Sequence, residues 1–368
     1  MADLTASTTT TGTPEAGGAS APPADERPKD QADLEARLAA HRSELTGYCY
    51  RMLGSSFEAE DAVQETFVRA WRFHERFEGR SAFRSWLYRI ATNVCFDMLN
   101  GRQRRALPMD LGPRGSADSP PGRTLPEETW VEPVPDDAVV LDTPGADPAD
   151  LAVHRESIRL AFVTAIQRLP AKQRAVLLLR EVLRWKAEEV ADLLGTSVPA
   201  VNSALQRARA TLAEDETIRA GGGEVGYDLD ASVARATASL DDDHADLLAR
   251  YVQAFEAFDM ESLVSLLHED AIHSMPPFPL WLQGSQAITA WMAGPGAECR
   301  GSRLLATTAN GMPAFAQYRV SQTGPGHDAW CLQVLDIIEG KVAGITYFLD
   351  TERLFPRFGL PLHLDPED

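Results

Sequence analysis

The apolar positions between residues 182 and 212 predict two short helices joined by a tight turn. The first helix would bury a stripe spaced by three and four residues, namely Ala187, Val190, Ala191 and Leu194. Gly195 follows where a helix ends most easily, and Ser197 and Pro199 suit the first turn of the next helix. The second buried stripe would be Val198, Val201, Leu205, Ala208 and Leu212. This layout is typical of a helix-turn-helix, although an ordinary helical hairpin with a polar outer face has the same pattern.

The outer face of the second of these helices carries side chains that can bond base edges or phosphates. They are Asn202, Ser203, Gln206, Arg207 and Arg209. Taken alone, this face fits a DNA reader as well as it fits a solvated helix surface. Its interpretation therefore depends on the rest of the chain.

Residues 31–105 show the same helical periodicity and are predicted to form an all-helical bundle. In the helix that begins near Phe57, five side chains would face the core: Val63, Phe67, Ala70, Trp71 and His74. An adjacent face of that helix carries Asp61, Gln64, Glu65 and Val68. A longer helix, from Ala82 to about Asn100, would bury Phe83, Trp86, Leu87, Ile90, Val94 and Met98.

Aromatic residues alternate with arginines and an asparagine along this longer helix and the loop before it. The residues concerned are Phe77, Arg80, Phe83, Trp86, Tyr88, Arg89 and Asn93. Rings can stack on unpaired bases while guanidinium groups hold phosphates, so the combination favours single-stranded DNA. For any single residue, packing in the core or lying on a solvated face is the simpler interpretation.

From His244 onward the pattern changes class. Residues 244–258 and 260–267 are predicted helices, and five strand-like runs lie between residues 271 and 349, with a helix over residues 286–292. Glycines punctuate these runs as turns. Two helices, a strand, a helix and a meander predict an α+β cone, in which a curved sheet wraps round a helix.

A cone of this kind encloses an apolar pocket, and four residues near its mouth are candidates for a ligand site: His273, Phe278, Trp281 and Trp291. His273, Asp336 and Asp350 could face inward, where an acid–base pair would support catalysis. No paired spacing demands catalysis. We therefore expect a regulatory domain first, ligand binding second and an enzyme last, because fold does not determine function.

The net charge of −19 at first argues against nucleic acid, because phosphate repels acidic groups. The charge is unevenly spread, however. Residues 31–105 hold 12 arginines against 10 acidic residues, and residues 151–219 hold 11 basic against 8 acidic residues. Residues 106–150 have 2 basic and 10 acidic residues, and residues 220–368 have 8 and 21. The acidity thus lies almost wholly outside the two candidate DNA-contacting segments.

The four cysteines lie far apart without a CxxC or His/Cys cluster, so no metal site and no cofactor are expected. Apolar runs are too short to span a bilayer, and the N-terminus lacks the features of a signal peptide. These features predict a cytoplasmic protein without a membrane partner.

Three stretches carry a resemblance to a known family. DAVQETFVRAW (61–71) and FEGRSAFRSWLYRIATNVCFDMLNGRQRR (77–105) resemble region 2 of the extracytoplasmic-function (ECF) sigma-70 family of RNA polymerase sigma factors. RLPAKQRAVLLLREVLRWKAEEVADLLGTSVPAVNSALQRARATL (168–212) resembles region 4. The C-terminal part, notably residues 276–284 and 348–361, is similar to the SnoaL-like domain that some of these sigma factors carry.

The resemblance implies a role for each group of residues. Asp61, Gln64 and Glu65 would contact the clamp helices of core RNA polymerase, and region 4 would contact its flap. Phe77, Arg80 and Phe83 lie in the loop that captures a flipped −10 base, while Trp86, Tyr88, Arg89 and Asn93 would meet the melted strand. Asn202, Ser203, Gln206, Arg207 and Arg209 would face the −35 major groove. Promoter DNA and core polymerase are thus the expected partners, and a small ligand in the cone is a further candidate.

The sequence therefore predicts a multidomain protein, with two all-α sigma domains and a C-terminal α+β cone. Its expected segments are a disordered tail (1–30), region 2 (31–105), an acidic linker (106–150), region 4 (151–219), a flexible linker (220–243) and the SnoaL-like domain (244–368). The expected function is promoter recognition and strand opening for the polymerase, regulated in cis by the cone. Two alternatives are a DNA-tethered SnoaL-like enzyme and a stand-alone helix-turn-helix repressor.

Overall fold

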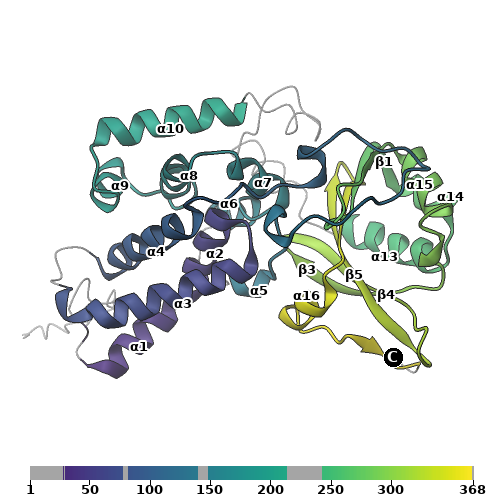
Figure 1. Cartoon of the computed structure of the whole chain (residues 1–368), viewed down its shortest axis with the longest axis horizontal. Helices are drawn as coiled ribbons and strands as arrows, with labels where there is room; N and C mark the ends of the chain where they lie inside the picture. The colour runs from purple at the N-terminus through teal and green to yellow at the C-terminus, as the bar shows by residue number, and fades with distance from the viewer. Residues whose placement is uncertain (1–27, 29, 78–81, 140–147, 214–242, 367–368) are drawn as a thin grey trace, which may run out of the picture.

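The computed structural model describes residue 28 and residues 30–77, 82–139, 148–213 and 243–366. The predicted tail, except for residues 28 and 30, lies outside the described residues, as do Arg80 and nearly all of the predicted flexible linker. Figure 1 shows a helical half, in purple and teal, beside a half built on a sheet, in green and yellow. The expected fold class, helical domains followed by an α+β cone, is confirmed.

Region 2 is a helical bundle of α1 (Gln31–Ala40), α2 (Arg42–Leu53), α3 (Ser56–Phe73) and α4 (Phe83–Leu99), with a 3₁₀ turn over His74–Arg76 after α3. Gly54 ends α2 in the left-handed conformation, with φ of 73°. Ser55 then caps α3, because its hydroxyl accepts the Glu58 N–H at 3.2 Å.

Region 4 consists of α6 (Pro148–Glu156), α7 (Leu160–Gln167), α8 (Ala171–Leu177), a π-helical turn (Leu178–Val182), α9 (Ala187–Leu193) and α10 (Val198–Ala213). The helices α9 and α10 form the predicted helix-turn-helix. Gly195 lies between them with φ of 61°. On α10 the buried residues are Val201, Ala204, Leu205, Ala208 and Leu212, which places the opposite polar face outward.

Residues 106–139, which join the two helical regions, have short elements of their own. They comprise 3₁₀ turns at Pro108–Asp110 and Glu127–Thr129 and the helix α5 (Asp136–Val139). Ala106 and Trp130 form a parallel bridge that closes the loop between them. Trp130 and Val131 of this segment are both buried.

The cone begins with α13 (Asp243–Glu256) and α14 (Met260–Leu266). The sheet follows as β1 (Leu267–Ser274), β2 (Trp281–Gln283), β3 (Arg303–Ala309), β4 (Met312–Val320), β5 (His327–Ile338), β6 (Lys341–Phe348) and β7 (His363–Leu364). Between strands lie α15 (Ser285–Ala293), a 3₁₀ turn at Ala297–Cys299 and α16 (Thr351–Arg357). The strand order is β2-β1-β6-β5-β4-β3, with β7 on β5. All pairs are antiparallel except β1 with β6.

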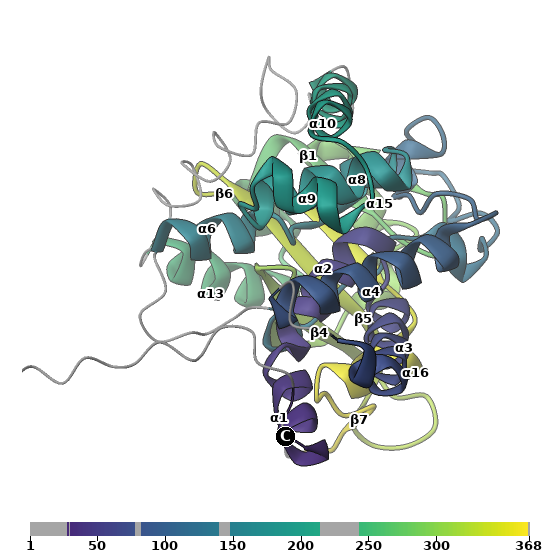
Figure 2. The ribbon, with the colours of Figure 1, turned by 90° about the vertical axis from the view of Figure 1, so that its left-hand side faces the viewer.

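The sheet separates two hydrophobic cores, because successive side chains of a strand point to opposite faces. On β5, Cys331 and Leu335 belong to the core inside the cone. Leu332 and Val334 belong instead to a core that is continuous with regions 2 and 4. Figure 2 shows helices of regions 2 and 4 in front of this outer face of the sheet. The cone is therefore packed against the helical half of the protein.

Candidate nucleic-acid interface

The five residues predicted to read duplex DNA all lie exposed on the outer face of α10, because the apolar stripe of the helix is turned to the core. They are Asn202, Ser203, Gln206, Arg207 and Arg209. The Arg207 guanidinium donates to the Ser203 hydroxyl at 2.6 Å, one helical turn away. Arg209 is ion-paired with Glu181 at 2.6 Å. Four of the five thus form an open polar surface, and Arg209 is held at its edge by an acidic partner.

The residues predicted to meet unpaired bases differ widely in exposure. Phe77 and Phe83 are buried, and their rings pack on each other and on half-buried Trp86 with centroids 5.2–5.7 Å apart. Asn93 is exposed on the surface of α4. Arg80 lies outside the described residues. The structure thus brings three aromatic residues of this group together at the start of α4.

Tyr88 is fully buried beneath region 4. Its ring lies 5.2 Å from that of Trp185, which precedes α9, and 5.1 Å from that of Tyr48. Burial raises the pKa of the Tyr88 hydroxyl well above its usual value. In this arrangement Tyr88 has no surface to offer a DNA strand.

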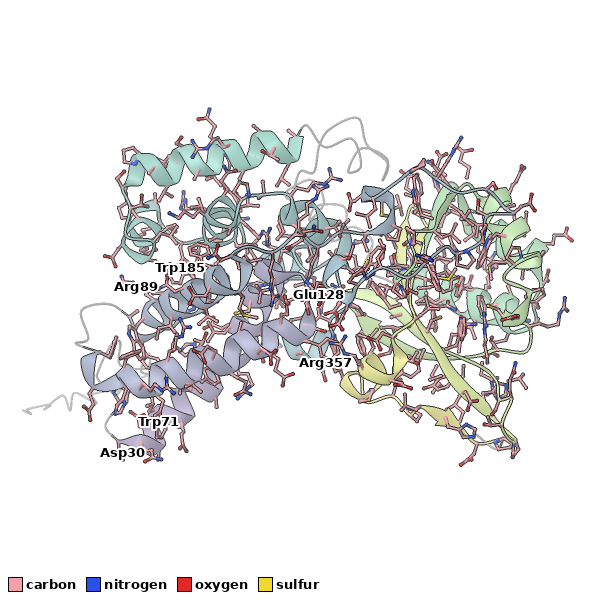
Figure 3. All side chains as sticks on the ribbon, viewed as in Figure 1. Asp30, Trp71, Arg89, Glu128, Trp185 and Arg357 are labelled. Carbon is pink, nitrogen blue, oxygen red and sulfur yellow. The ribbon has the colours of Figure 1, made fainter. Side chains whose placement is uncertain are left out.

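Arg89 is also engaged by region 4. Its guanidinium lies 2.6 Å from the Asp192 carboxylate at the end of α9 and donates to the Asp192 carbonyl at 3.2 Å. Figure 3 shows Arg89 and Trp185 close together where α4 meets α9. Region 4 therefore covers part of region 2, an arrangement that we call the closed arrangement.

Two buried arginines stabilise the closed arrangement. Arg51 of α2 donates to the Ser157 hydroxyl at 3.0 Å and to the His154 carbonyl at 3.2 Å. Arg174 of α8 donates to the carbonyl of Met52 and to the side chain of Gln167. Burial lowers the pKa of each guanidinium to about 10, so both remain charged at neutral pH while bonded to carbonyls. These bonds tie α2 to the end of α6 and to α8.

The exposed face of α3 carries the residues predicted to contact polymerase. Asp61 and Gln64 are exposed, and Glu65 is ion-paired with Arg69 at 2.7 Å. Trp71, predicted to face the core, is 38% exposed, and that prediction is wrong. Positions 61, 64, 68 and 71 share one helical face, so Trp71 lies on the outer side with Asp61. Figure 3 shows Trp71 on the outside of α3.

Inside the cone, His273 on β1 is buried against the rings of Trp291 and Tyr347, with centroids 5.2 and 4.6 Å away. Neither ring nitrogen has a hydrogen-bond partner in the part of the chain that the structure describes, and burial lowers the pKa of His273 to about 3. The expectation that Asp336 and Asp350 face inward is wrong. Asp336 lies on the opposite face of the sheet, where it pairs with Arg159. It is two residues after Val334 on β5, so the two side chains point to the same, outer face. Asp350 pairs with Arg353 at 3.2 Å beside α16.

Comparison with known proteins decides the family. Sequence models match for Sigma-70 region 2 over residues 38–105, Sigma-70 region 4 over residues 159–212 and the SnoaL-like domain over residues 248–345. The chain is 48% identical over 343 residues to ECF RNA polymerase sigma factor SigG of Mycobacterium tuberculosis, covering 92% of this chain and 86% of that protein. The chain belongs to the ECF RNA polymerase sigma factors.

Other sigma factors match over parts of the chain or in fold. ECF sigma factor SigW of Bacillus subtilis is 30% identical over 172 residues, which are 47% of this chain and 82% of that protein. The crystal structure of SigJ from Mycobacterium tuberculosis superposes with a TM-score of 0.54 at 22% identity, covering 89% of this chain and 99% of that chain. The SigJ structure therefore supports the overall fold of this sigma factor.

The acidic linker of this sigma factor lies across the mouth of its cone. The indole N–H of Trp281 donates to the Gly112 carbonyl at 2.9 Å, and that of Trp291 donates to the Ser119 carbonyl at 3.2 Å. Backbone bonds from Gly115 to Trp281 and from Leu125 to Pro277 complete the contact. Figure 1 shows this dark-blue loop reaching the strands beside β1 and α15. Two of the four residues predicted to form a ligand site thus hold the sigma factor's own linker, while half-buried Phe278 packs against the core inside the cone.

Asn310, in the turn between β3 and β4, joins three parts of the sigma factor and was not predicted. Its amide nitrogen donates to the Tyr50 hydroxyl of region 2 at 2.6 Å and to the Ile158 carbonyl of region 4 at 2.7 Å. Its amide oxygen accepts the Val134 N–H of the linker at 3.1 Å. The sequence signals the turn by the Asn-Gly pair at 310 and 311, but nothing in the pattern signals the partners.

Two further features of the described residues concern metal binding and membrane insertion. No group of three or more His, Cys, Asp or Glu residues that could hold a metal ion occurs among them. None of the helices in the described ranges is long and apolar enough to cross a membrane.

Proposed function

We propose that this ECF sigma factor binds core polymerase through the exposed face of α3, reads the −35 element with α10 and opens the −10 element with α4 and the loop before it. We further propose that its cone acts in cis by stabilising the closed arrangement. The observation that carries the regulatory part is the cover that Trp185 places on Tyr88 and α9 places on Arg89.

The exposed face of α10 supports the −35 assignment. Asparagine and glutamine pair best with adenine in the major groove, and arginine pairs best with guanine. Asn202 and Gln206 lie about one helical turn apart, Arg207 follows Gln206, and all three side chains are exposed. A recognition helix that crosses the major groove contacts bases with such a face.

The span of a promoter requires the closed arrangement to open. The −10 and −35 elements are separated by about 25 base pairs, or roughly 85 Å at about 3.4 Å per pair. In the closed arrangement, α4 and α9 are in direct contact through Arg89 and Asp192, 2.6 Å apart. Regions 2 and 4 must therefore separate before both can engage one promoter.

Contacts from the cone to both helical regions support a restraining role. Arg357 of α16 pairs with Glu60 of α3 at 2.6 Å, and the guanidinium lies 4.4 Å from the centroid of the Phe57 ring. Asp336 of β5 pairs with Arg159 at the start of α7. Together with Asn310, these contacts hold region 2 and the start of region 4 against one sheet. Separation of the regions would break them.

The enzyme alternative is weakened by the placement of the expected acid–base partners, because Asp336 and Asp350 both lie outside the cone's interior. Three polar side chains within the cone bond to one another. Tyr251 donates to Gln333 at 2.8 Å, and Gln333 donates to Gln317 at 2.9 Å. This neutral network is typical of a packed interior, and a regulatory cone explains it without a reaction.

Run-off transcription with core polymerase tests the proposal. A chain that ends near Gly221 should transcribe several-fold more than the full chain from the same promoter, because the restraint is gone, while promoter choice stays the same. The double variant Arg207→Ala with Gln206→Ala serves as a control for promoter reading in both chain lengths. Equal transcription by the full and shortened chains across a range of salt would show that the cone is an inert passenger.

A further inference from the structure

A cavity of about 210 Å³ lies where three parts of the chain meet. One wall is the helix α7, a second is the start of the acidic linker, and the third is the outer face of the sheet, formed by β1, β5 and β6. Most of the lining is apolar, and it includes Met109, Leu160, Ala165, Ile272, Met312 and Val334. The cavity exists only while these three parts are together.

This cavity is separate from the interior of the cone. Ile272 lines it, whereas the next residue on β1, His273, contacts Trp291 and Tyr347 on the other side of the sheet. Because side chains alternate along a strand, the sheet itself separates the two spaces. A ligand in the cavity would not compete with the linker at the cone mouth.

Four of the five charged residues that line the cavity have partners of opposite charge, and the fifth, Asp270 of β1, is exposed to solvent. Arg159 pairs with Asp336, and Arg168 pairs with Asp110, whose other carboxylate oxygen accepts the Leu107 N–H at 3.0 Å. A charged ligand would have to disrupt one of these pairs or enter an apolar space without a counter-ion, which is unfavourable. The charges therefore select a neutral occupant.

Thr164 offers a place for one hydrogen bond. This lining residue of α7 is 8% exposed, and its hydroxyl has no hydrogen-bond partner among the described residues. A buried polar group without a partner is unfavourable by about 1–3 kcal/mol, so a ligand that bonds to it gains affinity. A hydroxyl can either donate or accept, so it suits a phenol, an alcohol or an amide equally.

We propose that this cavity binds a neutral, largely apolar molecule of roughly ten non-hydrogen atoms with one hydrogen-bonding group, because a dry apolar cavity of about 150 Å³ already binds benzene. Since α7, the linker and the sheet each supply part of the wall, the ligand binds the assembled arrangement and not the separated one. Binding therefore shifts the population toward the arrangement in which the cone is docked. The site and this coupling follow from the geometry and do not depend on the proposed role in transcription.

A matched pair of probes tests the site in the full chain. 4-Propylphenol and propylbenzene have nearly the same size, and only the first can bond to Thr164. Isothermal titration should show saturable one-to-one binding of both, with the phenol bound more tightly. Thr164→Val keeps the volume of the side chain and should lower the affinity for the phenol about three- to tenfold while leaving propylbenzene unchanged.

Two further variants locate the binding. Ala161→Phe adds bulk at the exposed edge of the cavity on α7 and should weaken both probes at least tenfold. Thr289→Val should leave both affinities unchanged. Thr289 lies on α15 and does not line the cavity, and its hydroxyl donates to the Ser285 carbonyl of the same helix at 2.7 Å. Absence of saturable binding, or binding that Ala161→Phe leaves intact, would overturn the site. An equal loss for both probes in Thr164→Val would overturn the role of the hydroxyl.

Discussion

The Tyr88 ring on α4 lies 5.2 Å from the Trp185 ring ahead of α9, and the Arg84 guanidinium lies over both rings. The distances from the guanidinium carbon to the two ring centroids are 5.2 and 5.5 Å. The contact therefore combines an aromatic pair with cation–π interactions, each of which contributes about 0.5–1 kcal/mol or more. It forms on the helix that we propose takes part in strand opening.

Loosening the surface part of this contact should release region 2. Asp192→Asn removes the carboxylate that holds Arg89, and the Asp192 side chain is 74% exposed, so the fold should tolerate the change. An exposed ion pair contributes about 0.2–1 kcal/mol, so promoter affinity of the holoenzyme should rise by up to about fivefold at low salt. Fluorescence anisotropy on promoter DNA measures this. Glu188→Gln, an exposed residue on the same helix, is the control, and an identical gain there would point to a general charge effect.

The α10 face should discriminate between bases. Arg207→Ala should weaken −35 binding by about 1–3 kcal/mol, the usual loss for a specific base contact. Gln206→Ala should instead relax discrimination at one base pair. Competition binding with a set of −35 substitutions separates the two effects. Wild-type affinity and specificity in both variants would mean that another surface reads the DNA.

Strand opening should depend on Asn93, which is exposed on α4 in the closed arrangement. Asn93→Ala should lower open-complex formation, since contacts to an unpaired base are worth about 1–3 kcal/mol. Binding to core polymerase should be unchanged, because Asn93 is not on α3. Permanganate footprinting of duplex and pre-melted promoters measures the effect. A defect that pre-melting fails to rescue would indicate misfolding or lost polymerase contact.

Asn310 should be needed for docking of the cone. Asn310→Ala removes the side-chain partner of the Ile158 carbonyl and of the Val134 N–H, and one of the two partners of the Tyr50 hydroxyl, so we expect a loss of about 2–4 kcal/mol. Chemical denaturation of the full chain measures it. Asn310→Gly controls for the backbone, since φ of 58° suits glycine. If the glycine variant were as stable as wild type, backbone strain and not hydrogen bonding would explain the alanine result.

Glu132 should make stability fall as pH rises toward neutrality. This linker residue is buried beside the Ser55 hydroxyl, and burial raises its pKa from 4.5 to about 7, against the smaller opposing effects of Ser55 and Arg105. Between these pH values the native state holds a proton that the unfolded chain has lost, so the unfolding free energy falls with pH, by up to about 3 kcal/mol.

Denaturation at several pH values between 4.5 and 7.5 checks this dependence. Glu132→Gln should flatten it, because the amide can still bond to Ser55 but does not titrate. Glu128→Gln is the matched control, because Glu128 lies in the same linker, four positions before Glu132, and is exposed. An unchanged slope in Glu132→Gln would assign the titration to another group.

Elements with strong periodicity were predictable, and contacts between distant parts were not. The stripe on α10 and the strand alternation from β3 to β6 give the helix-turn-helix and the meander directly. The prediction for Trp71 is wrong because a large apolar side chain suggests burial. Trp71 lies instead on the same exposed face of α3 as Asp61. Periodicity in a single sequence does not distinguish a helix face that packs in the core from an apolar face that binds another protein.

The placement of the linker depends on backbone groups, which explains why the sequence did not reveal it. Gly112 and Ser119 accept indole N–H groups through their carbonyl oxygens, and every residue type has such an oxygen. The parallel pairing of β1 with β6, which sets the two faces of the cone, is equally long-range. Likewise Tyr88 fits both a stacking role and a core role, and only the position of Trp185 decides between them in this arrangement.

The loop that crosses the cone mouth belongs to the same polypeptide as regions 2 and 4, so the cone meets it at an effective concentration fixed by chain length, typically in the millimolar range for a short connection. Making more or fewer copies of the protein leaves the docked fraction unchanged, whereas a separate inhibitor could be outnumbered. A competitor for the same surfaces, such as polymerase or promoter DNA, lowers that fraction, and a ligand of the cavity beside α7 raises it. The response of this sigma factor should therefore follow the supply of competitors and be insensitive to its own expression level.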